Sequence, residues 1–341
     1  MKIKLNNLKN KKLLIAVKEA GAGSLLAALL KELNPIHGSL VLASKVASKY
    51  FHDIQIMTDV VDENFNYDFN NIIKSVSPDY VLVGASANES VEKKIILASQ
   101  KLNLKVISFI DHYSNLWQRF AHEKSANKWF YKPNFIFVID KICKEKLISL
   151  GWPKQNIGVN PHPLIKRNKY RKKIDKKNIL NKINIPENAK VITFVSEYNF
   201  RKSDTWKWEQ SSDNDKEIIL KFIIDYLFIQ NKKSILKTYL IIKLHPNETR
   251  FNSSLYKNFS SKHTRILKNE LDKESFLRIS DLVVGLNSML LLEASSFGLP
   301  VFSYPGSLQN TAVKLHEINK NIILIDDINA FKFKMDNLIK N

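Results

Sequence analysis

Two polar residues and one carboxylate in the last third of the chain have the types and spacing of a phosphate- and sugar-binding element. Asn287 and Ser288 stand between a strand-length apolar run at 281–285 and an apolar helix predicted at 289–297. Backbone N–H groups and the positive dipole end at such a helix start suit a phosphate. Glu293 lies inside the apolar helix, where a buried carboxylate needs a partner such as a ribose hydroxyl. The alternative is a lysine partner or solvent at the helix edge.

Two glycines offer a second cradle for phosphate or sugar. An apolar run at 12–18 leads into Gly21 and Gly23, which precede a helix predicted at 25–33. Glycine lets a backbone approach a ligand closely, although any tight strand-to-helix turn uses the same residue.

Further polar side chains directly follow strand-length apolar runs. They are Asp111 and His112 after 106–110, Ser196 and Glu197 after 190–195, and His245 and Pro246 after 238–244. The carboxyl ends of parallel strands share one edge of a sheet, and ligands bind at that edge. We therefore expect these residues near functional sites.

Strand and helix signals alternate along the whole chain, which predicts an α/β protein. The alternation runs through two series, separated by a proline-bounded basic segment. At 341 residues, this predicts two Rossmann-like, doubly wound domains facing across a cleft. The predicted parts are a first domain at 1–163, a basic linker at 164–186, a second domain at 187–325 and a closing helix at 326–341.

The composition is that of a globular, cytoplasmic protein. Hydrophobic residues make up 44% of the chain and charged residues 25%. No run approaches the ~20 apolar residues that a membrane-spanning helix requires. Cys143 is the only cysteine, which excludes an internal disulfide and a cysteine-built metal site.

The formal net charge of +20 is spread along the chain, apart from one dense basic cluster at 166–177. The cluster is consistent with a solvated linker, with peripheral contact to anionic lipid headgroups on the inner face of a membrane, or with a nucleic-acid patch. We favour the linker and do not expect nucleic acid as a partner. A non-catalytic basic binding module is the least favoured function.

The second half resembles the GT-B glycosyltransferase superfamily. The residues that carry the resemblance are Leu244, His245 and Pro246 at a strand end, then Asn287, Ser288, Glu293 and Ala294, then Gly298, Leu299, Pro300 and Val301. The pattern is most similar to bacterial capsule and lipopolysaccharide transferases with an HP motif, including CMP-sugar-using sialyl- and Kdo-transferases and polyol-phosphate transferases. It also resembles the non-hydrolysing UDP-GlcNAc 2-epimerases, which share the fold. The resemblance covers 190–306 and extends to the first half only in layout.

This resemblance implies the GT-B arrangement, with 1–163 as the acceptor-side domain and 187–325 as the domain that binds a nucleotide-sugar donor. His245 of the HP motif would contact the donor phosphate, and Ser288 with Glu293 would bind phosphate and ribose. Ser196 and Glu197 could flank the base. The resemblance further implies a glycan, lipid-linked or protein acceptor. It implies no metal or other cofactor, because this fold usually manages leaving-group charge with protein groups.

An inverting transferase needs a base in its acceptor half, and Asp111 or His112 at a strand end fits that role. The aromatic and polar residues that follow, Trp117 among them, suit stacking on a sugar. Alternatively, Asp111 caps a helix whose aromatic residues belong to the core. Glu19 and Glu89 are weaker candidates for the base.

The sequence therefore predicts a glycosyltransferase that moves a sugar from a nucleotide donor to a surface-glycan or protein-glycan acceptor. The alternative is a nucleotide-sugar epimerase or hydrolase of the same fold. Epimerases carry acidic and glutamine residues where this chain has Leu290, Leu291 and Leu292, and the acid/base loop of epimerases is not evident. Ser24 follows Gly23 where related hydrolases have histidine. The donor base, the sugar and the acceptor do not follow from the sequence.

Overall fold

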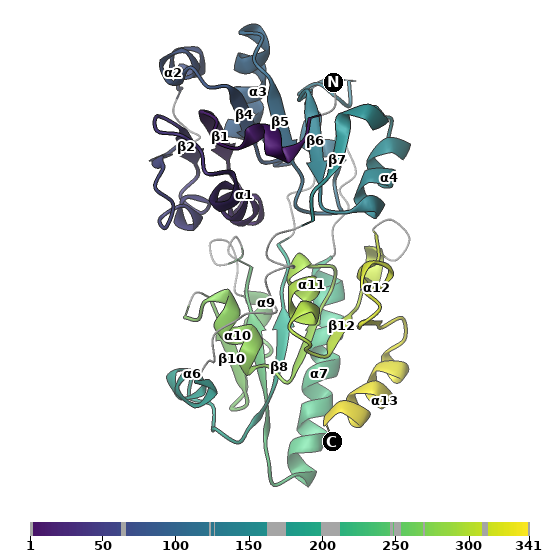
Figure 1. Ribbon diagram of the computed structural model, residues 1–341. Helices are drawn as coiled ribbons and strands as arrows, with labels where there is room; N and C mark the ends of the chain where they lie inside the picture. Colours follow the sequence, from purple (N-terminus) through teal and green to yellow (C-terminus); the bar gives the residue numbers. More distant parts are fainter. Residues whose placement is uncertain are drawn as a thin grey trace. The chain divides into compact units, whose positions relative to one another are not determined.

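The computed structural model describes residues 3–62, 66–122, 124–125, 127–161, 175–198, 212–245, 248, 254–268, 270–308 and 313–339. The chain divides into two compact units, Met1–Lys166 and Arg167–Asn341 (Figure 1). Each unit is built on its own parallel sheet with helices packed against it, so the predicted α/β class and the two Rossmann-like units are confirmed. The finer boundaries and the cleft stay predictions.

The first unit holds a seven-stranded parallel sheet in the order β3-β2-β1-β4-β5-β6-β7. Its strands are β1 (Leu13–Val17), β2 (Leu40–Ala43), β3 (Met57–Val60), β4 (Tyr80–Val83), β5 (Val106–Phe109), β6 (Phe135–Val138) and β7 (Ile157–Val159). Its helices are α1 (Ala20–Leu33), α2 (Phe69–Val76), α3 (Val91–Lys101) and α4 (Lys141–Ser149), with 3-10 turns η1 (Leu5–Leu8), η2 (Ser48–Tyr50), η3 (Gln118–Phe120) and η4 (Lys154–Asn156). Chain order reverses between β1 and β4, the position where such sheets bind ligands.

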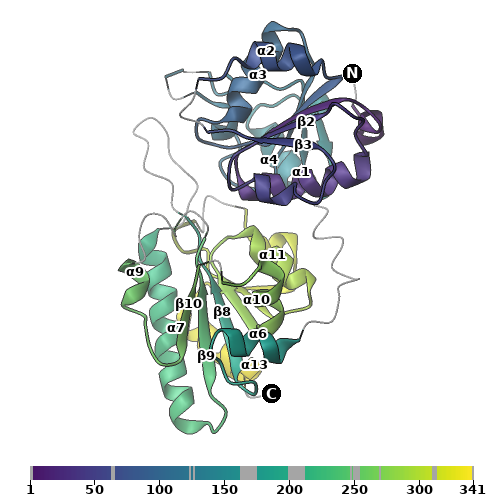
Figure 2. The same ribbon diagram turned by 90° about the vertical axis from the view of Figure 1, so that its left-hand side faces the viewer.

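The central strands β1, β4, β5 and β6 are buried on both faces, which is why they could be recognised as apolar runs. Leu14 of β1 packs with Ile73 of α2 and Ile95 of α3. Its neighbour Ile15 points to the opposite face, because side chains alternate along a strand, and it is equally buried. Figure 2 shows helices on both sides of the sheet.

Side-chain caps begin the helices as local chemistry predicts. Asp68 caps α2 and Ser90 caps α3, each accepting from the backbone N–H three residues later. The helix predicted at 25–33 starts earlier than expected, because α1 already begins at Ala20. Gly21 and Gly23 therefore lie in the first turns of a helix and not in a loop.

The second unit repeats the plan with a six-stranded parallel sheet in the order β10-β9-β8-β11-β12-β13. Its strands are β8 (Lys190–Val195), β9 (Thr238–Lys243), β10 (Thr264–Leu267), β11 (Leu282–Gly285), β12 (Val301–Ser303) and β13 (Ile322–Leu324). Its helices are α6 (Lys176–Lys182), α7 (Asp213–Lys233), α9 (Ser254–Lys257), α10 (Lys273–Ile279), α11 (Met289–Ser296), α12 (Leu315–Ile318) and α13 (Ile328–Ile339), with η6 (Gly306–Leu308). Here the order reverses between β8 and β11.

Two cores cover the two faces of this second sheet. Ile192 of β8 packs in a core with Ile223 of α7 and Phe331 of α13. The adjacent Val191 packs on the other face with Leu180 of α6. The helix α6 falls within the linker predicted at 164–186.

The predicted membrane contact at 166–177 lies almost entirely outside the described residues. Of that cluster, Lys176 pairs with Asp281 at 3.0 Å and Lys177 with Glu187 at 2.8 Å. In the part of the chain that the structure describes, no helix combines the length and the apolar character needed to cross a membrane.

The packing of α13 predicts that Phe331→Ala destabilises the second unit. Phe331 is fully buried against the rings of Phe222 and Phe302, so truncation leaves a cavity that costs about 3–5 kcal/mol. Phe333 of the same helix is 69% exposed and serves as the matched control. Urea unfolding should show a clear loss for Phe331→Ala and less than about 0.5 kcal/mol for Phe333→Ala. Equal effects would mean that α13 does not pack as described.

Candidate functional site

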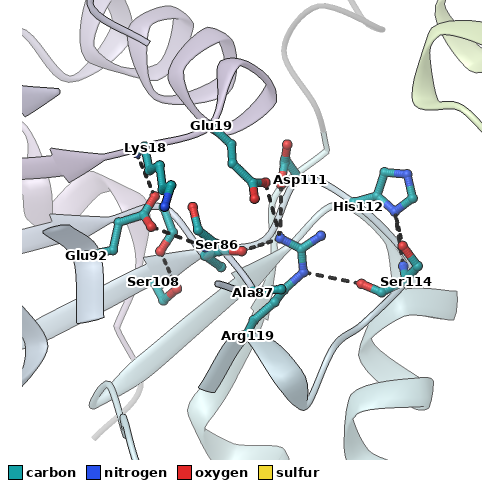
Figure 3. A network of polar contacts seen from close by, with 12 residues as sticks. Lys18, Glu19, Ser86, Ala87, Glu92, Ser108, Asp111, His112, Ser114 and Arg119 are labelled. Carbon is teal, nitrogen blue, oxygen red and sulfur yellow. Dashed lines mark hydrogen bonds and ion pairs between the residues drawn. The ribbon is translucent and has the colours of Figure 1, made fainter. Parts of the chain in front are cut away.

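A cluster of charged side chains lies at the carboxyl edge of the first sheet, next to the reversal between β1 and β4 (Figure 3). Its members come from the connections that follow β1, β4 and β5 and from the first turn of α3: Lys18, Glu19, Ser86, Glu92, Asp111 and Arg119. The sequence predicted Asp111 for this place and Glu19 as a weaker candidate, but it missed Glu92 and Arg119.

Arg119 is the centre of the cluster. Its side chain is 6% exposed, and its guanidinium donates to the carbonyl oxygen of Ala85 and to that of Ser114, the latter at 3.2 Å. Its Nη1 lies 3.9 Å from Glu19 Oε2 and 3.9 Å from Asp111 Oδ1. The buried cation is thus held by backbone and faces two carboxyl groups, which offset the cost of burying its charge.

Glu19 occupies the cap position before α1 without making a side-chain capping bond. Burial raises its pKa from 4.5 to about 7, Arg119 opposes the rise, and the nearby Asp111 and Glu92 add to it. The side chain keeps 29% of its surface accessible, so a substrate can reach it. Near neutral pH, Glu19 is therefore present both as an acid and as a base, the property that general acid–base catalysis requires.

Asp111 reaches the cluster because residue 21 is glycine. A Cβ atom on Gly21 would lie 2.1 Å from Asp111 Oδ2, a distance that no side chain tolerates. Asp111 is 8% exposed, and the described residues offer its Oδ1 no hydrogen-bond donor. Such an orphaned buried oxygen is expected at a functional site. Gly21 was predicted as a phosphate or sugar cradle; in this structure it makes room for a carboxylate.

His112, the other predicted base, points away from the cluster (Figure 3). Its Nδ1 accepts a hydrogen bond from the backbone N–H of Ser114 at 3.1 Å and lies 2.8 Å from the Ser114 hydroxyl oxygen. A ring nitrogen that accepts from an N–H carries no proton, so the neutral ring is protonated at Nε2. Of these two neighbours, Asp111 is the better candidate for a base; both roles stay predictions.

Glu92 supports the cluster from α3. It is 1% exposed and accepts from the backbone N–H of Lys18 at 2.9 Å and of Ser86 at 3.3 Å. Burial raises its pKa, and these hydrogen bonds oppose the rise. The contacts join the ends of β1 and β4. Glu89, three residues earlier, instead accepts from the Tyr131 hydroxyl at 2.8 Å and is exposed.

The second unit presents its own polar edge where β8 and β11 end. Glu197 accepts a hydrogen bond from the backbone N–H of Asn287 and so joins the two strand ends. Ser288 caps α11 by accepting from the N–H of Leu290 at 3.3 Å, as its position in the sequence predicts.

Gly23, which the sequence predicted as part of a phosphate or sugar cradle in the first unit, packs on Ala47 inside the fold.

His245 lies at the same edge, after β9. Burial lowers its pKa from 6.5 to about 4, Glu248 opposes the fall, and Lys216 and Lys243 add to it. The imidazole is therefore neutral at pH 7 and contacts an anion through an N–H rather than through charge. The ring of Tyr198 stacks beside it, with centroids 6.1 Å apart. Pro246 lies outside the described residues.

A buried network missed by the sequence holds this turn in place. Glu248 Oε2 accepts from the backbone N–H of His245 at 3.0 Å, and its Oε1 accepts from Lys216 Nζ at 2.9 Å and from the Tyr256 hydroxyl at 2.8 Å. The Tyr256 hydroxyl also contacts Ser196 Oγ. The network fixes the ends of β8 and β9 relative to the start of α7.

Glu293 does not present a free carboxylate. It is buried, and its Oε2 lies 2.7 Å from Lys273 Nζ of α10. Of the two interpretations that the sequence left open, the structure contains the lysine partner. Its role in ribose binding stays a prediction.

Asp213 and Asp215 have the spacing of an Asp-x-Asp metal motif, but both carboxylates are occupied by protein groups. Asp215 accepts from Ser212 and Ser307, and these hydrogen bonds outweigh burial and lower its pKa. Asp213 pairs with Lys216 at 3.2 Å. Across the described ranges, no group of three or more His, Cys, Asp or Glu side chains is arranged to hold a metal ion.

Several solved structures share this fold at low sequence identity. A UDP-GlcNAc 2-epimerase from Neisseria meningitidis, bound to UDP-GlcNAc, is 16% identical and matches 96% of this chain and 91% of its own, with a TM-score of 0.67. The S. aureus MnaA–UDP co-structure is 15% identical and matches 97% and 88%, with a TM-score of 0.63. Anabaena HepE in complex with UDP and glucose is 13% identical and matches 97% and 90%, with a TM-score of 0.63. No family model and no curated protein matches the chain.

These structures correct the prediction of a glycosyltransferase. Those that are named for an activity are UDP-GlcNAc 2-epimerases, the class that the sequence held as its alternative. The physical reason for the error is that His245, Ser288 and Glu293 were expected to bind the nucleotide. A nucleotide-binding element serves epimerases and transferases alike, so these residues could not separate the two.

The buried position of Glu19 predicts a pH-dependent cost to stability. The pKa of Glu19 is about 7 in the folded state and has the ordinary value of 4.5 in an unfolded chain, so the unfolded chain loses this proton at a lower pH than the folded protein does. The free energy of unfolding therefore falls as pH rises from 4.5 to 7. Glu19→Gln stays neutral and should be more stable than wild type by roughly 1–3 kcal/mol at pH 8, and about equal at pH 4.5. Urea unfolding at both pH values measures this. The exposed Glu145→Gln is the control; a gain at pH 8 shared by both variants would refute the assignment.

Proposed function

We propose that this protein is an enzyme that acts on a UDP-linked sugar and epimerises the sugar. The observation that carries the proposal is the pair Glu19 and Asp111, two carboxyl groups 3.9 Å from one guanidinium nitrogen of Arg119. Support comes from the fold, which this chain shares with UDP-GlcNAc 2-epimerases and with structures that hold UDP.

The chemistry of epimerisation at a C–H carbon needs such a pair. A base takes the proton, and the electron pair of the broken C–H bond forms a double bond to the neighbouring carbon as UDP departs from it. UDP then adds back to that neighbour while an acid returns a proton to the other face of the first carbon. Glu19 supplies either form near pH 7. The two reactive oxygens are at most 7.8 Å apart, twice 3.9 Å, so one sugar carbon can lie within reach of both. Arg119 stabilises negative charge as it builds.

The second unit would supply the nucleotide site. The positive dipole end at the start of α11 and the neutral imidazole of His245 suit the phosphates of UDP. Glu248 and Lys216 keep the His245 backbone in position. The hydrolase alternative uses the same nucleotide site and differs in releasing the sugar.

The decisive experiment is incubation with a panel of UDP-sugars in D₂O without any acceptor. We expect an epimer that carries deuterium at the inverted carbon, detected by NMR. Asp111→Asn and Glu19→Gln should each slow its formation by ~10²-fold or more, because each removes one acid–base group. Glu89→Gln, an exposed carboxylate outside the cluster, should stay near wild type.

The experiment has three outcomes, which distinguish an epimerase, a hydrolase and a protein of neither class. Epimer with deuterium supports the proposal. Free sugar and UDP without epimer would favour the hydrolase. Absence of exchange, epimer and hydrolysis with every UDP-sugar would overturn the assignment to this class of enzyme.

Binding of UDP alone tests the second unit separately. His245→Ala should weaken UDP binding by about 1–3 kcal/mol in calorimetry, the range for losing a hydrogen bond to a charged group. His263 precedes β10 at the amino edge of the sheet, so His263→Ala is the matched control and should bind as wild type does. Equal binding by the two variants would remove His245 from the nucleotide site.

A further inference from the structure

The C-terminal end of α7 and the turn that leads to β9 lie at the amino edge of the second sheet (Figure 1). This segment carries exposed apolar side chains. We call residues 228–237 the α7 tip. Its exposed apolar side chains are Phe228 at 62%, Ile229 at 43%, Ile235 at 97% and Leu236 at 46%. Four such side chains in ten residues form a patch that a water-exposed turn does not need.

The fold holds this turn firmly in its exposed form. Asn231 accepts from the Thr238 N–H at 2.8 Å and donates to the Thr238 carbonyl oxygen at 2.9 Å. Lys237 Nζ donates to the carbonyl oxygens of Asn231 and Ser234, each at 2.7 Å. These bonds satisfy the end of α7 and fix the backbone on both sides of Ile235. Because these hydrogen bonds already order the backbone, binding through the apolar side chains costs little further conformational entropy.

The tip is positively charged as well as apolar. Lys232 and Lys233 are exposed in the last turn of α7, and Lys237 follows. No Asp or Glu occurs between 226 and 237. Lysines are expected at a helix C-terminus, where they complement the dipole, but the apolar side chains beside them have no such reason. Lys232 Nζ lies 4.0 Å from the centre of the Phe228 ring, so charge and apolar surface share one patch.

We propose that the α7 tip binds peripherally to an anionic lipid surface. Lysine ammonium groups would meet the headgroups while Ile235 and Leu236 enter the boundary with the acyl chains. A second copy of this chain fits less well, because a two-fold contact through the tip would bring like charges together. Nucleic acid fits less well too, since its phosphates gain nothing from aliphatic side chains. The site at the carboxyl edge of the sheet lies at the other end of the strands and is left open.

Flotation of the full-length protein with vesicles tests this proposal. We expect binding to phosphatidylcholine vesicles with about one third phosphatidylglycerol, and little binding to phosphatidylcholine alone. Ile235→Ser with Leu236→Ser should lower the bound fraction at least tenfold, and so should Lys232→Gln with Lys233→Gln. All four side chains are exposed, so the variants should fold, which circular dichroism and thermal unfolding confirm.

Matched controls test whether binding depends on the α7 tip itself or only on the net charge and exposed apolar area of the protein. Lys257→Gln with Lys262→Gln removes the same charge from exposed positions elsewhere in this unit, and Met57→Ser with Val60→Ser removes exposed apolar side chains from β3. Both controls should bind as wild type does. Equal loss in the lysine pairs would mean non-specific attraction and overturn the proposal. So would salt-sensitive binding to RNA that the tip variants lose without any vesicle binding, or tip-dependent dimers in light scattering.

Discussion

A parallel sheet that is buried on both faces leaves no room for polar chemistry except at its edges. In both units the central strands are largely apolar, since helices cover each face. Charged side chains can enter only where the strands end and the backbone turns toward a helix. The strand order reverses between β1 and β4 in one unit and between β8 and β11 in the other, and sheets of this kind bind ligands at that edge. The candidate sites of this protein occupy these two places.

The carboxyl groups at these two edges differ in the donors that surround them. Glu92 and Glu248 accept backbone N–H groups and serve as supports. Glu293 faces a lysine within an ion pair. Glu19 and Asp111 share one arginine at a longer distance, 3.9 Å, and are the less completely satisfied. Leaving a buried polar group incompletely satisfied is costly to stability, and the proposed proton exchange with a substrate rests on this feature of the two groups.

The two units differ in how much they reveal about the reaction. The second unit carries the motifs that resemble nucleotide-sugar enzymes, and a phosphate site alone does not specify what happens to the sugar. The first unit carries the cluster of Glu19, Asp111 and Arg119, and the proposed proton transfer uses its two carboxyl groups. A transferase and an epimerase of one fold can share the phosphate site, but they must differ in the groups that act on the sugar. This is why the class of enzyme was wrong when argued from the second unit.

The sequence by itself determined the elements, because their signals are local. Apolar runs marked the strands, Ser288 marked the start of α11, and polar residues after strands marked Asp111 and His245 as belonging to an edge. Only the tertiary structure decided which of these residues meet. Arg119 reaches Ala85 across 34 residues, Glu92 reaches Lys18 across 74, and Glu197 reaches Asn287 across 90. Such pairs have no period or spacing in the chain. They exist because strand order places the ends of distant strands together, and the absence of a Cβ at Gly21 leaves room for the Asp111 carboxylate.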